Sequence, residues 1–354
     1  MCFDYSITEN NFQALDDSYI SAKTGAKKQR PWRAKKMANE LLATAYDEID
    51  KAKAIRLREC AKILSFRLYE NGVKTLDSMN SCRVRLCPMC SWRRSLKNFY
   101  NNLKVAEWLA ENDPGEWLHL TLTIKNVGAD DLNTTIDTLM YAFKKFMMIK
   151  EVKKAVKGFY RGLEVTHDCL KIITKEDFAK RGKYLKSLGF KVGDSNPTFD
   201  TYHPHFHVLL HVNKSYFKSR DYMSAEKWAK AWQQALQTDY IPSVKVQRLK
   251  DYGSGIKGAI AEVSKYATKS SDVLCVDDWD LTVETVRVLD KALANRRLIA
   301  YGGSCLKAQK ALKLEDADNG DLVNVGQNKE LEGLNYEIIN YAWHTGYSEY
   351  GKIN

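Results

Sequence analysis

The chain has 354 residues, of which 44% are hydrophobic, and a formal charge of +11. This length suffices for one large domain or for two to three smaller ones, and no stretch approaches the ~20 apolar residues that a membrane-spanning helix needs. The positive charge favours a polyanionic partner, although charge alone does not distinguish DNA from RNA or from an anionic membrane.

The N-terminal segment is polar and basic. It begins Met1-Cys2-Phe3-Asp4, without the basic-then-apolar pattern of a signal peptide, so we expect a cytoplasmic location. Residues 1–30 end in Lys27-Lys28-Gln29-Arg30 and are predicted to form a flexible basic arm, either a solvated tail or a contact to a DNA backbone. From Pro31 to about Tyr69 apolar residues recur at mostly helical intervals among Lys and Arg, which predicts helices with basic exposed sides.

A cysteine cluster follows, in which Cys82, Cys87 and Cys90 have the spacing Cys-x4-Cys-x2-Cys. Cytoplasmic proteins rarely carry a disulfide framework, so a tight cluster indicates a metal, and a structural zinc needs a fourth ligand. Cys60 is the nearest upstream candidate, with Cys2, Cys275 or a histidine as alternatives. Three buried, unligated cysteines are the interpretation without a metal. A zinc would hold nearby arginines where they can meet phosphates, namely Arg83, Arg85, Arg93 and Arg94.

The middle of the chain alternates between helical and strand patterns. A helix is predicted for 91–111, before the turn Asn112-Asp113-Pro114-Gly115, and a strand for 117–124 whose outward face carries Thr121 and Thr123. After a helix over 130–156, a strand over 159–167 turns Glu164 outward. Residues 168–201 are rich in glycine and charge, which predicts a largely exposed insertion.

Four of the seven histidines lie in the stretch His203-Pro204-His205-Phe206-His207-Val208-Leu209-Leu210-His211. With a two-residue period, Phe206 and Val208 face a core, while His205 and His207 project together from the other face, which suits a divalent metal better than ordinary hydrogen bonds. If the three strands are neighbours in one antiparallel sheet, Glu164 joins both imidazoles and completes a three-ligand site with positions open to substrate oxygen. Glu164 is otherwise a solvent-facing strand residue.

The remaining elements include a second constellation. A helix over 224–238 has Trp228 and Trp232 as core residues, and a strand is predicted for 244–249. A helix over 256–270 carries Glu262 and Tyr266 on one face, four residues apart, with Lys265 and Lys269 alongside; a tyrosine there is otherwise a packing residue. A helix over 281–293, a strand over 297–301 and an acidic, turn-rich stretch over 314–328 follow. No Walker loop or dinucleotide fingerprint is present.

Four separated motifs together resemble those of rolling-circle plasmid replication initiators (Rep) of the zinc-cluster-containing type, which belong to the single-tyrosine HUH (His-hydrophobe-His) endonuclease superfamily. They span residues 60–270 in the family's order: the cysteine cluster with Trp92-Arg93-Arg94, the strand Leu120-Thr121-Leu122-Thr123, Gly162-Leu163-Glu164-Val165-Thr166 leading to the histidine strand, and Glu262-x-x-Lys265-Tyr266-x-x-Lys269. The insertion between Glu164 and the histidines is longer than in the family's pattern.

The resemblance implies a metal-dependent, site-specific nickase and strand transferase in the bacterial cytoplasm. Such proteins cut one strand at a plasmid's double-strand origin, stay attached through a 5′-phosphotyrosine, leave a 3′-hydroxyl primer for the host helicase and replication machinery, and perform strand transfer at termination. Carried over, Tyr266 is the nucleophile and Glu262 activates the terminating water. The resemblance makes His205, His207 and Glu164 the ligands of Mg²⁺ or Mn²⁺, beside a structural Zn²⁺. Lys265 and Lys269 would stabilise the developing charge.

The expected fold class is α+β, with a central antiparallel sheet of about five strands, helices on one face and metal and tyrosine on the other (the HUH endonuclease fold), preceded by a helical zinc-binding region. We expect a flexible arm over 1–30, a zinc-binding DNA-contact region over 31–112, an endonuclease domain over 113–305 and a C-terminal extension over 306–354. The alternatives are an HUH transposase or relaxase with similar chemistry, and a non-catalytic zinc-dependent DNA-binding regulator. The regulator leaves Glu164, His205, His207 and Tyr266 without a task.

Overall fold

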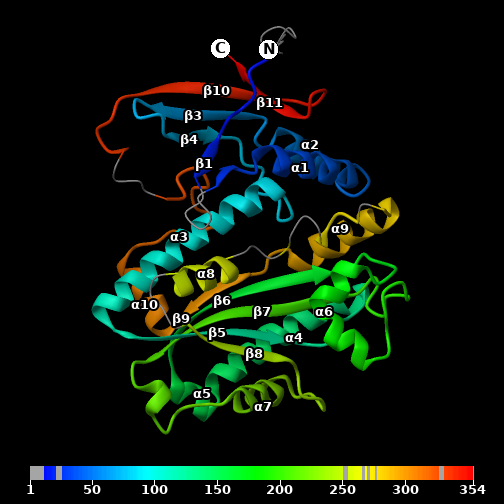
Figure 1. Cartoon of the computed structure of the whole chain (residues 1–354), viewed down its shortest axis with the longest axis vertical. Coiled ribbons are helices and arrows are strands. Elements are labelled where there is room, and N and C mark those ends of the chain that lie inside the picture. The colour runs from blue at the N-terminus through cyan, green and yellow to red at the C-terminus, as the bar shows by residue number, and fades with distance from the viewer. Residues whose placement is uncertain are drawn as a thin grey trace. The chain divides into compact units, whose positions relative to one another are not determined.

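A computed structural model describes residues 12–20, 26–249, 254–264, 268, 272–275, 277–326 and 331–353. The chain divides into two compact units (Figure 1): Met1–Tyr100 with Glu315–Asn354, and Asn101–Leu314. Within the described residues, no helix has the length and apolar character needed to cross a bilayer.

The second unit is built on a five-stranded antiparallel sheet with the order β8-β5-β7-β6-β9. Its strands are β5 (Gly115–Thr123), β6 (Val156–His167), β7 (Tyr202–Asn213), β8 (Val244–Leu249) and β9 (Ile299–Gly302). The three strands that carry the outward-facing Thr, Glu and His residues are therefore neighbours, with the histidine strand between the other two. This sheet confirms the predicted α+β fold class.

The second unit has helices on both faces of this sheet, and α4 packs on the apolar face. Its helices are α4 (Ala129–Met148), α5 (Lys150–Ala155), α6 (Lys175–Ser187), α7 (Ala225–Leu236), α8 (Ser254–Val263), α9 (Trp279–Leu293) and α10 (Gly303–Ala311), with a short 3-10 turn η2 (Tyr216–Lys218). Phe143 of α4 packs edge-on against Phe206 of β7. Trp228 and Trp232 of α7 are fully buried, which confirms that they are core residues.

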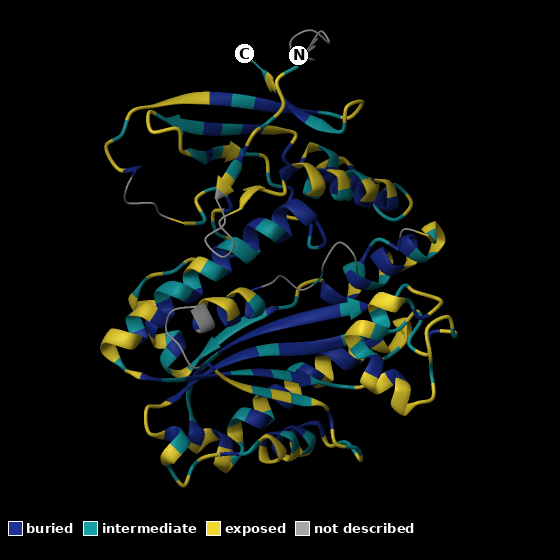
Figure 2. Cartoon of the chain, viewed as in Figure 1, coloured by how far each residue is buried: buried dark blue, intermediate teal, exposed yellow. Residues whose placement is uncertain are grey.

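The opposite face of the sheet is also partly covered. Leu209 and Tyr160 lie on this face, and they line a small enclosed space with Ile260 of α8 and Val105. Val105 belongs to the long helix α3 (Pro88–Asn112). Because both faces are packed, β6 and β7 are buried along most of their length (Figure 2). The predicted arrangement with helices on one face alone is thus incomplete: α8 and the end of α3 occupy part of the second face.

The insertion 168–201 contains one element that its composition did not reveal. The helix α6 begins after Thr174, whose side chain accepts a hydrogen bond from the backbone of Asp177, while the Asp177 carboxylate accepts one from the backbone of Thr174. This reciprocal capping box satisfies two of the free N–H groups at the helix start. The glycine and charge content predicted the exposure of this segment correctly, but it did not indicate the helix.

The first unit has a four-stranded antiparallel sheet with the order β11-β10-β3-β4. Its elements are β1 (Ser18–Ile20), β2 (Lys27–Gln29), α1 (Trp32–Asp47), α2 (Lys51–Glu59), β3 (Ile63–Tyr69), β4 (Lys74–Met79), β10 (Tyr336–His344) and β11 (Glu349–Ile353). The prediction that the helices continue to Tyr69 is wrong. Helix α2 ends at Glu59, Ala61 takes a left-handed φ of 52°, and Leu64 and Phe66 then bury one face of a strand.

The two ends of the chain meet in this sheet. Strand β10 lies between β3 and β11, so residues 336–353 complete a sheet that begins at Ile63. Within the segment 1–30, β1 pairs with β2, and Ala14 bridges to Gly351. The last segment of the chain is therefore an integral part of the first unit.

Candidate active site

The register of three neighbouring strands assembles the polar face of the second unit. Thr123 of β5 and Glu164 of β6 both lie opposite His205 of β7, while Thr121 lies opposite His207. Since side chains alternate across a strand, these residues all project to the same face. The structure thus brings together the five residues whose alternation placed them on one face.

Glu164, His205 and His207 form a compact group whose ligand atoms lie within 4.8 Å of one another. The Oε2 atom of Glu164 lies 3.0 Å from Nε2 of His207 and 3.7 Å from Nε2 of His205. The Glu164 side chain is almost fully buried, so its charge needs compensation by a cation. Two imidazoles and one carboxylate at these separations could hold a divalent metal on one side and leave its other positions open.

The orientation of His205 follows from its neighbour. Its Nδ1 lies 3.0 Å from the carbonyl oxygen of His203. A carbonyl can only accept a hydrogen bond, so Nδ1 carries the proton and Nε2 keeps a lone pair directed at Glu164. Such a backbone contact is the usual means by which a protein fixes the tautomer of a metal ligand.

His119 is a member of this site that the sequence argument did not single out. Its Nε2 lies 3.4 Å from Nδ1 of His207, and the two rings are stacked at 5.5 Å. His119 precedes Thr121 by two positions on β5 and therefore shares its face. The alternation of that strand, applied to the histidine as well as to the threonines, would have found it.

A cavity of about 420 Å³ opens beside the two stacked histidines. Lys245 and Gln247 of β8 line one side of it, and Glu262 of α8 lines another. The structure therefore places Glu262 at the same cavity as His207, although the two residues come from different motifs. A cationic side chain, a carboxylate and two histidines around one opening suit an anionic substrate and proton transfer.

The approach of α8 to the sheet depends on Gly162. A Cβ atom at this position would lie 2.9 Å from the carbonyl oxygen of Val263, closer than real Cβ contacts. Gly162 lies opposite His207 in the register, so the end of α8 passes directly over the strands that carry Glu164 and His207. A residue without a side chain is required there for Glu262 to reach the cavity.

The remaining residues of this motif lie outside the described part of the chain. They are Lys265, Tyr266 and Lys269. Helix α8 is described up to Val263, so the prediction of a helix continuing to Ser270 is not tested beyond that point.

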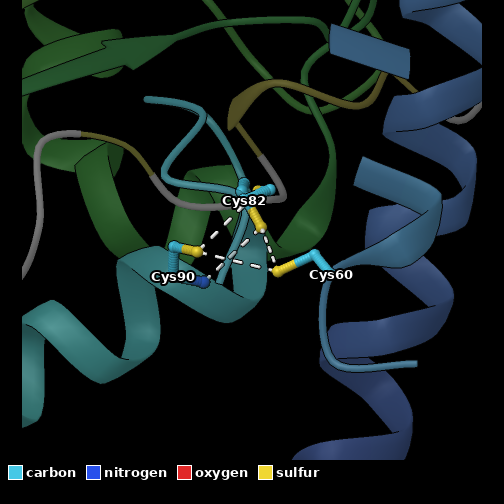
Figure 3. A group of neighbouring side chains, drawn as sticks. Cys60, Cys82 and Cys90 are labelled. Carbon is cyan, nitrogen blue, oxygen red and sulfur yellow. Dashed lines mark hydrogen bonds between the residues drawn. The ribbon is translucent and has the colours of Figure 1, made fainter. Parts of the chain in front are cut away.

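The second group of candidate ligands is the cysteine cluster of the first unit. The sulfurs of Cys60, Cys82, Cys87 and Cys90 lie within 4.8 Å of one another, and all four residues are buried. Figure 3 shows Cys60, Cys82 and Cys90 with their sulfurs turned toward one another; Cys90 Sγ lies 3.6 Å from Cys60 Sγ and 3.8 Å from Cys82 Sγ. A zinc with tetrahedral Zn–S bonds of about 2.3 Å requires sulfurs about 3.8 Å apart. The cluster has the size of such a site.

Buried polar contacts hold the cluster in place. The Cys87 thiol donates to Oδ1 of Asn39 at 3.1 Å, and Nζ of Lys36 donates to the carbonyl oxygen of Cys60 at 3.0 Å. Burial raises the pKa of the Cys87 thiol well above its usual value, so a thiolate there needs a cation. Cys60 is the residue that closes the set of four. Of the alternatives, Cys2 lies outside the described residues, and Cys275 is paired with Cys169 in a disulfide.

That disulfide differs from the expectation drawn from the cysteine count. Cys169 and Cys275 are separated by 106 residues, and the fold brings their Cα atoms to 5.5 Å. The argument against disulfides rested on the redox state of the cytoplasm, which says nothing about which cysteines the fold brings together.

Two of the predicted phosphate contacts are corrected by the structure. The side chains of Arg93 and Arg94 are buried, with exposed fractions of 5% and 3%. Nε of Arg93 donates to the carbonyl oxygen of Leu322 at 2.8 Å, and Nε of Arg94 lies 3.8 Å from the carboxylate of Asp318. Their position near the cluster led us to expect contacts to phosphate, but in this structure they anchor the acidic segment of the same unit and are not presented to a DNA backbone.

Arg83 and Arg85 are more accessible but contact the same segment. Arg83 donates to the carbonyl oxygen of Asp318 at 3.1 Å, and Arg85 forms an ion pair with its carboxylate at 3.1 Å. A contact from these two arginines to phosphate stays a prediction.

Fold and site together define an α+β protein with an antiparallel sheet, a His-hydrophobe-His group joined by a carboxylate, and a separate four-cysteine cluster. A family model described as "Replication protein" (Rep_1) matches residues 73–351. The chain is 36% identical to "Protein rep" of Bacillus amyloliquefaciens, with 97% of this chain and 98% of the relative covered. It is 34% identical to "Protein rep" of Streptococcus pneumoniae, with 91% and 92% covered.

The chain therefore belongs to this replication protein family. A further relative, "Protein rep" of Lactiplantibacillus plantarum, is 36% identical, with 86% of this chain and 89% of the relative covered. No solved structure gives a significant match.

Proposed function

We propose that this protein initiates rolling-circle replication of a plasmid by nicking one DNA strand at the double-strand origin through Tyr266. The observation that carries the proposal is the group of Glu164, His205 and His207 in a chain of the replication protein family, with His207 lining the same cavity as Glu262. A protein that only binds DNA needs no such constellation. The resemblance of the motif Glu262-x-x-Lys265-Tyr266 to single-tyrosine initiators supports the choice of nucleophile.

The nicking step transfers the scissile phosphoryl group from the 3′ oxygen of the DNA to the tyrosine oxygen. The phenolic oxygen of Tyr266 attacks the scissile phosphorus, a P–O bond to tyrosine forms, and the bond to the 3′ oxygen breaks. The departing oxygen takes up a proton and becomes the 3′-hydroxyl that primes synthesis. Since the phosphotyrosine conserves the phosphoester, strand transfer at termination needs no nucleotide. That agrees with the lack of a nucleotide-binding motif in the sequence.

The protein's own residues divide the remaining work. Glu164, His205 and His207 would hold Mg²⁺ or Mn²⁺, which when bound neutralises charge on the scissile phosphate. Lys265 and Lys269 would stabilise the charge that develops on it, and Glu262 would take the proton from the water that attacks at termination. A structural Zn²⁺ would be held by Cys60, Cys82, Cys87 and Cys90. Because all four residues are buried, this zinc would be shielded from solvent.

The proposed partner is plasmid origin DNA, as a supercoiled duplex and as the single strand that nicking releases. The net charge of +11 supports binding to a polyanion. Extension from the 3′-hydroxyl would require the host helicase and replication machinery.

A nicking assay tests the proposal. Supercoiled plasmid carrying the cognate origin is incubated with the protein and Mn²⁺ or Mg²⁺, and relaxed product and covalent protein–DNA adduct are measured. We expect Tyr266→Phe to bind the origin like the wild type but to form neither product, because only the attacking oxygen is removed. Tyr141→Phe is the matched control, since Tyr141 is an exposed tyrosine of α4, which packs on the sheet face opposite to His205 and His207.

The location of the adduct decides the assignment. Trypsin digestion should leave the DNA attached to the peptide that contains Tyr266. An adduct on another tyrosine would show that Tyr266 is not the nucleophile, and origin binding without nicking by the wild type would favour the non-catalytic regulator.

A further inference from the structure

A third group of potential ligands lies in the second unit, separate from both sites described above. His167 stands at the end of β6, Cys169 follows it, and Cys275 lies before α9. The ligand atoms of these three residues lie within 4.8 Å of one another. Nδ1 of His167 is 3.4 Å from Sγ of Cys169 and 3.8 Å from Sγ of Cys275. The two sulfurs are joined in a disulfide in this structure.

The other ring nitrogen of His167 has a partner that fixes its tautomer. Nε2 lies 3.0 Å from a carboxylate oxygen of Asp200. An ionised carboxylate only accepts, so Nε2 carries the proton and Nδ1 presents its lone pair toward the two sulfurs. A carboxylate behind an imidazole is the arrangement that orients histidine ligands in zinc sites.

We propose that His167, Cys169 and Cys275 form a second transition-metal site, of zinc type, when the two cysteines are reduced. Two thiolates and one imidazole are ligands that zinc prefers, and they supply three of its four positions. The fourth would be filled by water, because all three residues line an open cavity of about 980 Å³. Nothing in the replication motifs uses these residues.

The interconversion of the two states balances with a dithiol reductant. The reductant gives two electrons and two protons to the disulfide, which becomes two thiols, and is itself oxidised to a disulfide. Each thiol then loses a proton to solvent as its sulfur binds the metal. In a reducing compartment the thiol form dominates, so the metal would be the resident link there.

Either the disulfide or the metal would cross-link two segments that are distant in the sequence. The disulfide closes a separation of 106 residues, and a shared metal would close the same one. At one end of this cross-link, His167 stands on the strand that carries Glu164. At the other end, Cys275 follows the Glu262 helix in the chain. Oxidation would replace the metal by the disulfide, and the two segments would stay cross-linked.

Metal content tests the inference without reference to activity. The full-length protein is reduced under anaerobic conditions, loaded with Zn²⁺ alone and freed of excess metal, and its zinc is counted by elemental analysis. We expect the wild type to bind one zinc more than the double variant Cys169→Ser/Cys275→Ser. Cys305→Ala, which changes a buried cysteine of the same unit, should bind as much as the wild type. With Co²⁺ in place of zinc, the wild type should show the stronger thiolate-to-cobalt absorption.

Two further measurements cover the case in which the double variant fails to fold. Wild type oxidised with a disulfide reagent should bind one zinc fewer than the same protein reduced. Asp200→Asn should weaken the extra site about 10- to 100-fold in competition with a chelator, since it removes the carboxylate behind His167 and leaves the cysteines intact. Equal zinc content in reduced and oxidised wild type, or in reduced wild type and a folded double variant, would overturn the inference and leave a disulfide only.

Discussion

The Oε2 atom of Glu164 lies 3.0 Å from Nε2 of His207, although the strand register places Glu164 opposite His205. The carboxylate thus reaches diagonally along the sheet and stands between the two imidazoles, 3.7 Å from the nearer nitrogen of His205. Diagonal neighbours in an antiparallel pair remain within reach of long side chains. A glutamate can span this diagonal and contact one cation together with both histidines.

Glu164→Gln should weaken Mn²⁺ binding by at least about tenfold, equivalent to about 1.4 kcal/mol. The change keeps the size of the side chain but removes the negative charge that compensates the cation. Calorimetric titration of the metal-free protein with Mn²⁺ measures the effect, and the Mn²⁺ concentration for half-maximal nicking should rise in parallel.

Glu116→Gln is the control for this variant. Glu116 stands on strand β5 of the same sheet and pairs with Arg248 at 3.2 Å, so the variant removes the same charge outside the histidine group. Equal Mn²⁺ affinity of Glu164→Gln and the wild type would remove Glu164 from the set of ligands.

Cys87→Ser should cost the protein one zinc and much of the stability of the first unit. Structural zinc sites contribute about 10 kcal/mol or more, and each kcal/mol lowers the Tm of a unit of this size by about 2–8 °C. We therefore expect the Tm of the first unit to fall by more than about 10 °C, measured by calorimetry beside zinc analysis. Cys305→Ala, at a buried cysteine outside the cluster, should keep its zinc; unchanged zinc in Cys87→Ser would show that the cluster binds none.

The buried His211 should make stability depend on pH. Burial, with the charge of Lys157 adding to it, lowers the pKa of His211 from 6.5 to about 4. Above pH 6.5 the ring is neutral in both folded and unfolded chains, so the contribution of His211 to folding stability is fully present. As the pH falls from 6.5 to 4, the unfolded chain binds a proton that the folded chain does not, and stability is lost, by up to about 3 kcal/mol.

His211→Gln should flatten this loss, because glutamine does not titrate and can still bond to Ser304, whose Oγ lies 2.8 Å from Nδ1 of His211. Urea unfolding at pH 7 and pH 4.5 gives the comparison. Burial also lowers the pKa of His203 to about 4, so the variant should retain part of the dependence. An unchanged difference between the two pH values would assign the effect to other groups.

Alternation along single strands was enough to predict most of the second unit. The period-two pattern located the strands of Thr121, Glu164 and His205, and because all three are central or next to central, each has one face that must be apolar. That requirement also fixed which residues project together. The grouping of Glu164 with His205 and His207 could be predicted for this reason, since it follows from the strand register.

Contacts between residues far apart in the sequence explain the features that the hydrophobic pattern did not predict. Ile63–Tyr69 is a strand because Phe66 pairs with Ile339, a residue near the other end of the chain, and no local signal reports such a partner. The burial of Arg93 under Leu322 has the same origin. Likewise, the cavity that joins Glu262 to His207 depends on how closely α8 approaches the sheet over Gly162, which spacing alone does not specify.

Glu262 should separate the start of replication from its end. Under the proposed mechanism, Tyr266 attacks the DNA in the first reaction and no water has to be activated. At termination a water would attack instead, and Glu262, which lines the cavity beside His207, would take its proton. We predict that Glu262→Ala nicks supercoiled origin DNA at close to the wild-type rate but fails to terminate at a second origin copy. Products longer than one plasmid unit should accumulate, resolved on denaturing gels.

The control must remove a carboxylate elsewhere in the same unit. Glu284→Ala serves, because Glu284 is an exposed residue of α9 that pairs with Arg287 one turn along its own helix. Its products should end at one plasmid unit. Since general bases typically contribute about 10²- to 10⁴-fold, the termination defect of Glu262→Ala should exceed any change in nicking by at least about a hundredfold. If both reactions fall by the same factor, Glu262 supports the geometry of the metal or of Tyr266, and a second nucleophile has no part in termination.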